Sequence, residues 1–123
     1  MVNKKNLLKI KEKIENWMKE YWLEHQDIPF KTPDDIPELP RTNANEWNDF
    51  YVPILLRRGA IPKDDLIIGK EYLGNCRNSE RAVWTGNKFV YNRNKFGTTY
   101  QEEIYHFQDD DGYDLFVPIM LIE

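Results

Sequence analysis

The chain has 123 residues, of which 41% are hydrophobic and 14% aromatic, and its formal net charge is −4. This length fits one domain, and so much apolar and aromatic material excludes a disordered chain. The single cysteine excludes an intramolecular disulfide and a zinc site built from thiolates, which favours a reducing cytoplasm. The first residues include no run of seven apolar side chains, so we expect neither a signal peptide nor a membrane span.

Residues 4–24 predict an amphipathic helix. Its apolar side chains recur at spacings of three and four, and charged side chains fill the other face. The apolar positions are Leu7, Ile10, Ile14, Trp17, Met18 and Tyr21. Such a stripe is typical of core packing, and the alternative is a surface for a partner helix.

Residues 26–42 contain four of the seven prolines, which predicts a loop on the surface. Residues 43–64 then indicate a second helix, with Asn43 or Asn45 as its cap and Gly59 at its end. Pro53 fits such a helix only near its first turns or at a kink. The expected buried side chains are Trp47, Phe50, Tyr51, Ile54 and Leu55.

After residue 65 the hydrophobic period changes to two, which predicts strands at 66–74, 82–93, 98–107 and 114–122. Turn residues at 85–87 and 109–112 indicate hairpins. The connections are too short for crossover helices, so we expect an antiparallel sheet. The prediction is an α+β fold, with N-terminal helices packed on a C-terminal antiparallel meander sheet or small open barrel. It is one domain, 1–123, mainly helical over 1–65 and made of antiparallel strands over 66–123.

Charge is unevenly distributed in the strand half. Residues 67–100 have six basic and two acidic side chains, whereas residues 101–123 have seven acidic and no basic ones. Guanidinium forks and amides gather within residues 74–97, and these groups suit phosphate or carboxylate. The alternative is that the cations pair across the strands with Glu102, Glu103 and the acidic turn. The candidate ligand-binding residues are Arg77, Asn78, Arg81, Trp84, Tyr91, Arg93 and Lys95.

The same strands suggest a second hypothesis, a module that binds single-stranded nucleic acid. Strand alternation places Phe89, Tyr91 and Arg93 on one face, where aromatic rings beside a cation could stack on bases. The hypothesis requires Phe89 and Tyr91 to be exposed, and the overall acidity weakens nonspecific attraction to phosphates.

The catalytic and metal-binding motifs that the sequence resembles require residue spacings that it does not have. Four residues separate Cys76 from Arg81, whereas the phosphate loop of cysteine phosphatases needs five. Residues 109–114 lack the spacing of a calcium loop, and His25 and His106 lie in different elements with no metal-ligand spacing around them. We therefore predict no catalytic residue, no metal and no cofactor. A hydrolase or nuclease that uses Cys76 or the acidic turn is the less favoured hypothesis.

Five segments, at 59–63, 69–78, 82–84, 89–97 and 106–119, resemble a group of small bacterial and prophage proteins. The shared pattern is Y-x-G-x-C-R-N, A-x-W, F-x-Y-x-R-x-K-F-G and D-x-F-x-P, in that order. The resemblance implies a phage or mobile-element setting and brings no activity with it. The residues with the clearest match are Cys76, Arg77, Asn78, Arg93, Lys95, Phe96 and Gly97.

Together these features predict a small, non-enzymatic, cytoplasmic accessory protein of the phage or prophage type. We expect residues 74–97 to bind an anionic small molecule or a host protein, with single-stranded nucleic acid as the alternative ligand. No membrane is expected as a partner, and a homodimer is compatible with each hypothesis.

Overall fold

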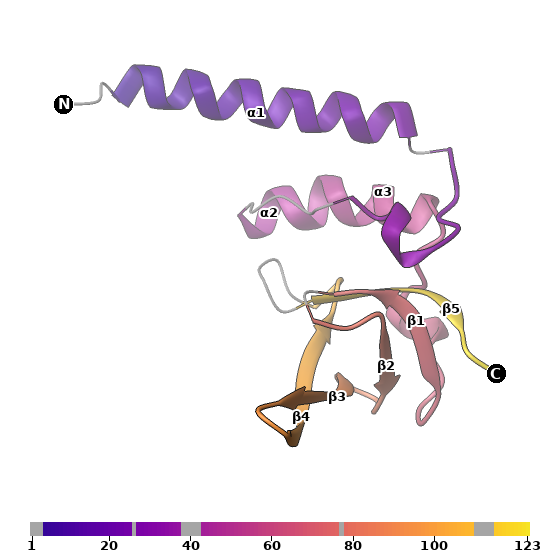
Figure 1. The fold of residues 1–123 in the computed structure, drawn as a ribbon. Helices are drawn as coiled ribbons and strands as arrows, with labels where there is room; N and C mark the ends of the chain where they lie inside the picture. Colours follow the sequence, from indigo (N-terminus) through magenta and orange to yellow (C-terminus); the bar gives the residue numbers. More distant parts are fainter. Residues whose placement is uncertain (1–3, 26, 38–42, 77, 110–114) are drawn as a thin grey trace.

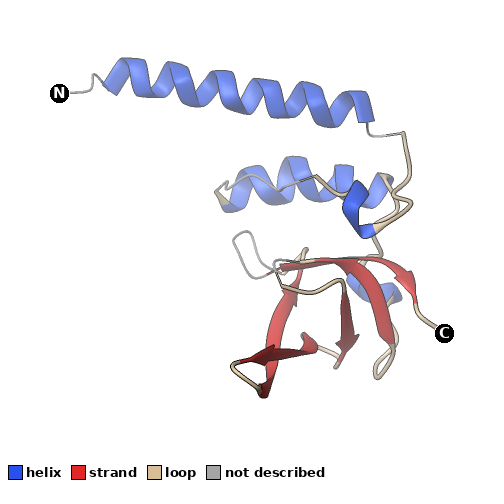
Figure 2. Cartoon of the chain, in the orientation of Figure 1, coloured by secondary structure: helices blue, strands red, loops and turns tan. Residues whose placement is uncertain are grey.

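The computed structural model describes residues 4–25, 27–37, 43–76, 78–109 and 115–123. Within these ranges the helices come first and five strands follow (Figures 1 and 2). The strands close into a small barrel, so the predicted α+β class is confirmed. None of the helices in the described ranges combines the length and the apolar character needed to cross a membrane.

The barrel follows the order β1-β2-β3-β4-β5 and returns to β1. Four of its ladders are antiparallel, as predicted, but β4 and β5 run parallel through the pairs Tyr105–Leu115 and His106–Phe116. A closed ring of five strands cannot alternate in direction all the way round, so one neighbouring pair must be parallel. The strands are β1 (Glu71–Asn75), β2 (Arg81–Trp84), β3 (Phe89–Lys95), β4 (Thr98–His106) and β5 (Leu115–Leu121).

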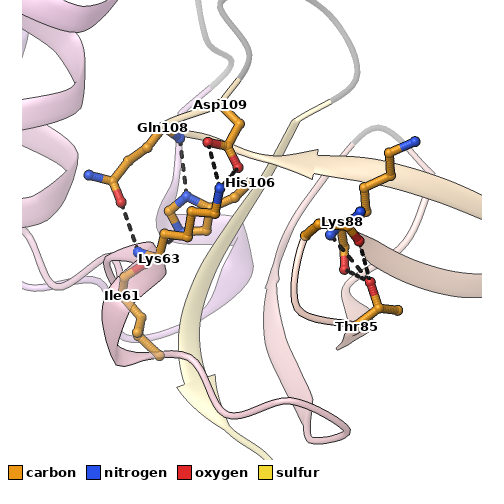
Figure 3. Close-up of polar contacts among 8 residues, drawn as sticks. Ile61, Lys63, Thr85, Lys88, His106, Gln108 and Asp109 are labelled. Carbon is orange, nitrogen blue, oxygen red and sulfur yellow. Dashed lines mark hydrogen bonds and ion pairs between the residues drawn. The ribbon is translucent and has the colours of Figure 1, made fainter.

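The parallel pairing corrects the expectation of a hairpin at the acidic turn. Residues 110–114 lie outside the described residues, but antiparallel neighbours are what a hairpin requires, and β4 and β5 are parallel. The hairpin at 85–87 is confirmed, since the Thr85 N–H donates to the Lys88 carbonyl at 2.9 Å (Figure 3). The strand predicted from residue 66 begins at Glu71, because Gly69 forms a turn with φ of +86° just before it.

The second predicted helix is one helical segment in three parts. These are α2 (Ala44–Glu46), a π-helical turn η2 (Trp47–Tyr51) and α3 (Val52–Arg57). Asn43 caps it, because its Oδ1 accepts the Glu46 N–H at 2.9 Å. The wider π turn precedes Pro53, whose ring would otherwise clash with a carbonyl one turn earlier. The segment stops at Gly59, where φ is +110°.

Two clusters of buried side chains form the core. One lies between the helices and the barrel, where Trp22 of α1 (Lys4–His25), Trp47 and Leu55 meet Val117 of β5. The other fills the barrel with Tyr72, Ala82, Trp84, Phe89, Tyr91, Ile104 and Phe116. The Trp47 Nε1–H also donates to the Phe107 carbonyl at 2.7 Å, so a hydrogen bond joins the helical segment to the end of β4.

The prediction that the stripe of the first helix packs in the core is wrong for most of its length. Only the last turns of α1 reach the core, whereas Leu7, Ile10, Ile14 and Trp17 are 50–63% exposed. At 1.5 Å per residue α1 is about 33 Å long, and the segment from α2 to α3 beneath it is about 21 Å. The N-terminal part of α1 therefore extends past its support (Figure 1).

A buried histidine, His106, forms hydrogen bonds that stabilise the connection between the helices and the barrel. The Gln108 N–H donates to His106 Nδ1 at 3.1 Å, so Nε2 holds the ring proton and donates it to the Ile61 carbonyl at 2.8 Å (Figure 3). Lys63 adds an ion pair to Asp109 at 3.0 Å. Burial of the ring is the main reason that the pKa of His106 falls to about 4.

The depressed pKa of His106 predicts acid sensitivity. Between about pH 6.5 and pH 4 the unfolded chain binds a proton that the folded chain does not, so stability present above pH 6.5 is lost as the pH falls. The shift corresponds to about 3 kcal/mol of unfolding free energy. Urea unfolding at several pH values should show this loss, and a His106→Asn variant, less stable at pH 7, should show a flatter dependence. An imidazole that titrates near 6.5 in the folded protein by NMR would contradict it.

Gly74 lies in β1 where the strand passes β5. A Cβ at this position would lie 2.2 Å from the Val117 carbonyl oxygen and 2.8 Å from the Phe116 ring. We expect Gly74→Ala to lower the unfolding free energy by about 2–3 kcal/mol, because backbone and a core ring would have to move. Gly69→Ala is the control, because its Cβ meets open space and only the positive φ opposes it, at about 1 kcal/mol. Equal losses in urea unfolding would contradict the close approach.

Candidate functional site

Two of the candidate residues belong to the barrel interior. Trp84 is 3% exposed and its ring centroid lies 4.9 Å from that of Phe89. Tyr91 is 9% exposed and packs in the same cluster. Trp84 therefore does not frame a ligand on the surface. Phe89 and Tyr91 do not offer the exposed platform that single-strand binding by these two rings requires.

The hydroxyl of Tyr91 reaches a polar cluster at the barrel edge. It donates to Glu102 Oε2 at 2.6 Å, and Arg93 Nη1 lies 3.3 Å from the other carboxylate oxygen. The Tyr91 hydrogen bond, followed by the charge of Arg93, lowers the pKa of Glu102. Burial, followed by the bond to Glu102, raises the pKa of Tyr91 to about 12, and the side chain of Asn78 acts in the opposite direction. The structure thus brings Tyr91 and Arg93 together around the Glu102 carboxylate, with the Asn78 side chain beside the Tyr91 hydroxyl.

Two further described cations, Arg81 and Lys88, also form ion pairs across strands, whereas Lys95 does not. Arg81 lies 3.8 Å from Glu71 on β1, and Lys88 lies 3.2 Å from Glu103 on β4. Lys95 is exposed and lies 5.7 Å from the ring centroid of Phe96. Arg77 lies outside the described residues.

Two open hollows lie beside β2. One, of about 540 Å³, is lined by residues of the β1–β2 turn, including Cys76 and Asn78. The other, of about 390 Å³, lies over β2 and β3. Arg81 borders both hollows, whereas Arg93 and Lys95 border neither. The candidate cations therefore do not converge on one of these hollows.

The geometry around Cys76 favours a neutral thiol. Its Sγ–H donates to the Ser79 carbonyl at 3.0 Å, and burial raises its pKa. A nucleophilic cysteine needs the opposite shift and a basic partner. His106 has both ring nitrogens engaged by Ile61 and Gln108. In the described ranges, no three His, Cys, Asp or Glu side chains are grouped as metal ligands.

The most unusual surface feature is the tip of the β3–β4 hairpin, residues 93–100. Lys95 pairs with Thr98, so Phe96 and Gly97 form a two-residue turn with φ of +53° and +77°. Such turns prefer Asn-Gly because both residues need positive φ. Phe96 is instead a bulky aromatic residue, and it is 92% exposed.

Other side chains extend this exposed tip. Arg93 and Tyr100 are opposite each other on the two strands, and Tyr100 is 47% exposed. With Lys95 and Phe96 they form a surface of two cations and two aromatic rings, which we call the hairpin tip. Phe96 and Tyr100 are not among the ligand-binding residues predicted from the sequence. The available signal was a Phe placed before Gly in a short turn between two predicted strands.

Comparison of the chain with protein-family models, with curated proteins and with solved structures gives no match. The resemblance to small bacterial and prophage proteins therefore stays a prediction.

The Glu102 cluster can be tested by carboxyl titration. We expect both Tyr91→Phe and Arg93→Met to raise the pKa of Glu102. Tyr91→Phe should raise it more, because its hydroxyl makes the shorter hydrogen bond and is the largest cause of the lowered pKa. Side-chain ¹³C NMR of Glu102 gives the values directly. A larger effect of Arg93→Met would instead make the ion pair the dominant interaction.

Proposed function

We propose that the chain is a small, non-enzymatic binding protein that inserts the hairpin tip into an apolar recess with an acidic rim on a partner protein. The exposed Phe96 at positive φ is the observation on which this proposal depends. A cytoplasmic location and a phage or prophage setting, with a host protein as partner, are part of the proposal. They derive from the single cysteine and from the resemblance described above.

The conformation of Phe96 lowers the stability of the fold, and the exposed contact of its ring with Lys95, 5.7 Å from the centroid, offsets only part of that loss. An L-residue in the left-handed region costs about 1–2 kcal/mol relative to the right-handed one. At 92% exposure the Phe96 ring gains little from burial. Strained residues of this kind cluster at ligand clamps, and aromatic residues, Phe among them, are enriched at the cores of protein interfaces. Binding to a partner explains why such a residue is placed there.

The charges of the tip favour an acidic surface around the recess. Arg93 is engaged by Glu102, but Lys95 makes no ion pair with any described residue. A cation beside an exposed ring both steers association and fixes orientation. An anionic small ligand is less favoured, because Arg81 and Arg93 are paired and border no shared hollow. Binding of single-stranded nucleic acid is also less favoured, because Phe89 and Tyr91, the two rings on which that hypothesis depends, are buried in the barrel.

The strain at Phe96 predicts that stability and binding respond in opposite directions to one substitution. We expect Phe96→Asn to raise the unfolding free energy by about 1 kcal/mol, because Asn adopts positive φ readily. The same substitution should lower affinity for the partner by at least tenfold, about 1.4 kcal/mol, because it removes the inserted ring. Urea unfolding measures the first effect and titration calorimetry with the purified partner measures the second.

The partner is obtained by capture from a bacterial lysate on the immobilised chain, with Phe96→Asn and Tyr105→Asn run in parallel. Tyr105 is the matched control, an exposed aromatic residue on β4 outside the tip. If the Phe96→Asn variant captures the same protein as the unmodified chain, the proposal is wrong. Oligonucleotide binding with a steep salt dependence would favour the nucleic-acid hypothesis. A nucleotide-induced rise in melting temperature that disappears in Arg93→Ala would favour the anionic ligand.

A further inference from the structure

An exposed apolar stripe runs along one side of α1. Leu7, Ile10, Ile14 and Trp17 are each at least half exposed, and Tyr21 continues the line to the point where the helix meets the body. At 100° per residue these positions fall within an arc of about 80°. The centre of the arc lies about 100° around the helix from the buried Trp22. From Leu7 to Trp17 the stripe therefore faces sideways, and only its last member, Tyr21, also packs against the core.

The spacing of the stripe is that of a coiled-coil seam. From Leu7 to Tyr21 the intervals are three, four, three and four residues, which is the a/d pattern of a heptad repeat. Side chains in this pattern pack as knobs into holes of a second helix with the same pattern. A helix partner thus fits the stripe better than a flat surface does.

The charges beside the stripe select the orientation of that helix. Lys13 and Glu20 are seven residues apart on the same edge of the stripe, and neither has an ion-pair partner within the described ranges. An antiparallel pairing that sets Ile14 opposite Trp17 of a second copy places Lys13 opposite Glu20 of that copy. Symmetry makes this contact twice. A parallel pairing places Lys13 opposite Met18 instead and forms neither ion pair.

We propose that a second copy of this chain covers the stripe, through antiparallel pairing of the two α1 helices. Self-association needs no other partner, because one helix supplies both the seam and the complementary charges. The pairing sets the free N-terminal half of each α1 beside the C-terminal half of the other. About two and a half heptads make a small interface, under roughly 1,200 Å² in total, so we expect a reversible dimer with a dissociation constant on the order of micromolar.

Sedimentation velocity on the full chain, from about 1 µM to about 500 µM, tests the dimer. We expect the sedimentation coefficient to rise with concentration from monomer to dimer. Ile14→Glu should raise the dissociation constant at least tenfold, because it sets a carboxylate in the apolar seam. Leu8→Glu is the matched control, because Leu8 is 60% exposed on α1 but lies off the stripe. Far-ultraviolet circular dichroism checks that both variants remain folded.

Charge reversal tests the register. Lys13→Glu and Glu20→Lys should each weaken the dimer, because each places like charges opposite one another twice. The double variant restores both ion pairs and should recover most of the affinity. Recovery is expected only when residues 13 and 20 of different copies are opposite each other. Additive loss in the double variant would overturn the antiparallel register.

A chain that stays monomeric over the whole concentration range would overturn the proposal. So would a dimer that Ile14→Glu leaves unchanged, since its interface would lie elsewhere. Phe96→Asn should dimerise like the unmodified chain, because the hairpin tip is not part of α1. Failure of the dimer and failure of the proposed binding function are therefore distinguishable in the same set of proteins.

Discussion

Strand β5 is buried on both faces, and the rest of the structure depends on that burial. Phe116 points into the barrel and packs against Phe89, while Leu115 and Val117 on the other face belong to the cluster that includes the helices. One strand therefore contributes to two cores, so the barrel and the helices are coupled in stability. The same strand leaves no room for a side chain at Gly74 and closes the ring onto β1.

His106 lies in the parallel pair of β4 and β5, the one pair that cannot be antiparallel in a closed ring of five strands. The parallel pair between β4 and β5 covers only two residues on each strand, and one of them is His106. A short ladder satisfies few backbone groups, and the imidazole supplies two further hydrogen bonds there, one to the Ile61 carbonyl and one from the Gln108 N–H. Because the ring is neutral in this arrangement, the junction is stable near neutral pH and is weakened by acid. The burial of this histidine thus has a structural explanation.

Local patterns in the sequence predicted the local structure well. Asn43 caps its helix and Trp47, Tyr51, Ile54 and Leu55 are buried, because a helical period and a capping residue are properties of the neighbouring residues alone. The parallel β4–β5 pair could not be predicted, because a period of two identifies a strand and not its neighbour. Tyr91 and Arg93 share a face, yet only Tyr91 is buried, because β3 extends past the barrel edge between them. The periodicity of α1 predicted an apolar stripe, but it could not identify the surface that packs against the stripe.

Folding energetics separate the features that need a partner from those that do not. The cross-strand pairs of Arg81, Lys88 and Arg93 have opposite charges within the fold and require nothing further. Phe96 and the stripe of α1 differ, because exposed rings and aliphatic side chains gain little from folding, and Phe96 also adds backbone strain. The two surfaces also differ in chemistry. The stripe has the repeat and the balanced charges of a seam that matches itself, whereas the hairpin tip has a cation, Lys95, that forms no ion pair with any described residue. A self-complementary surface suits a second copy, and a surface that lacks its complement suits a different protein.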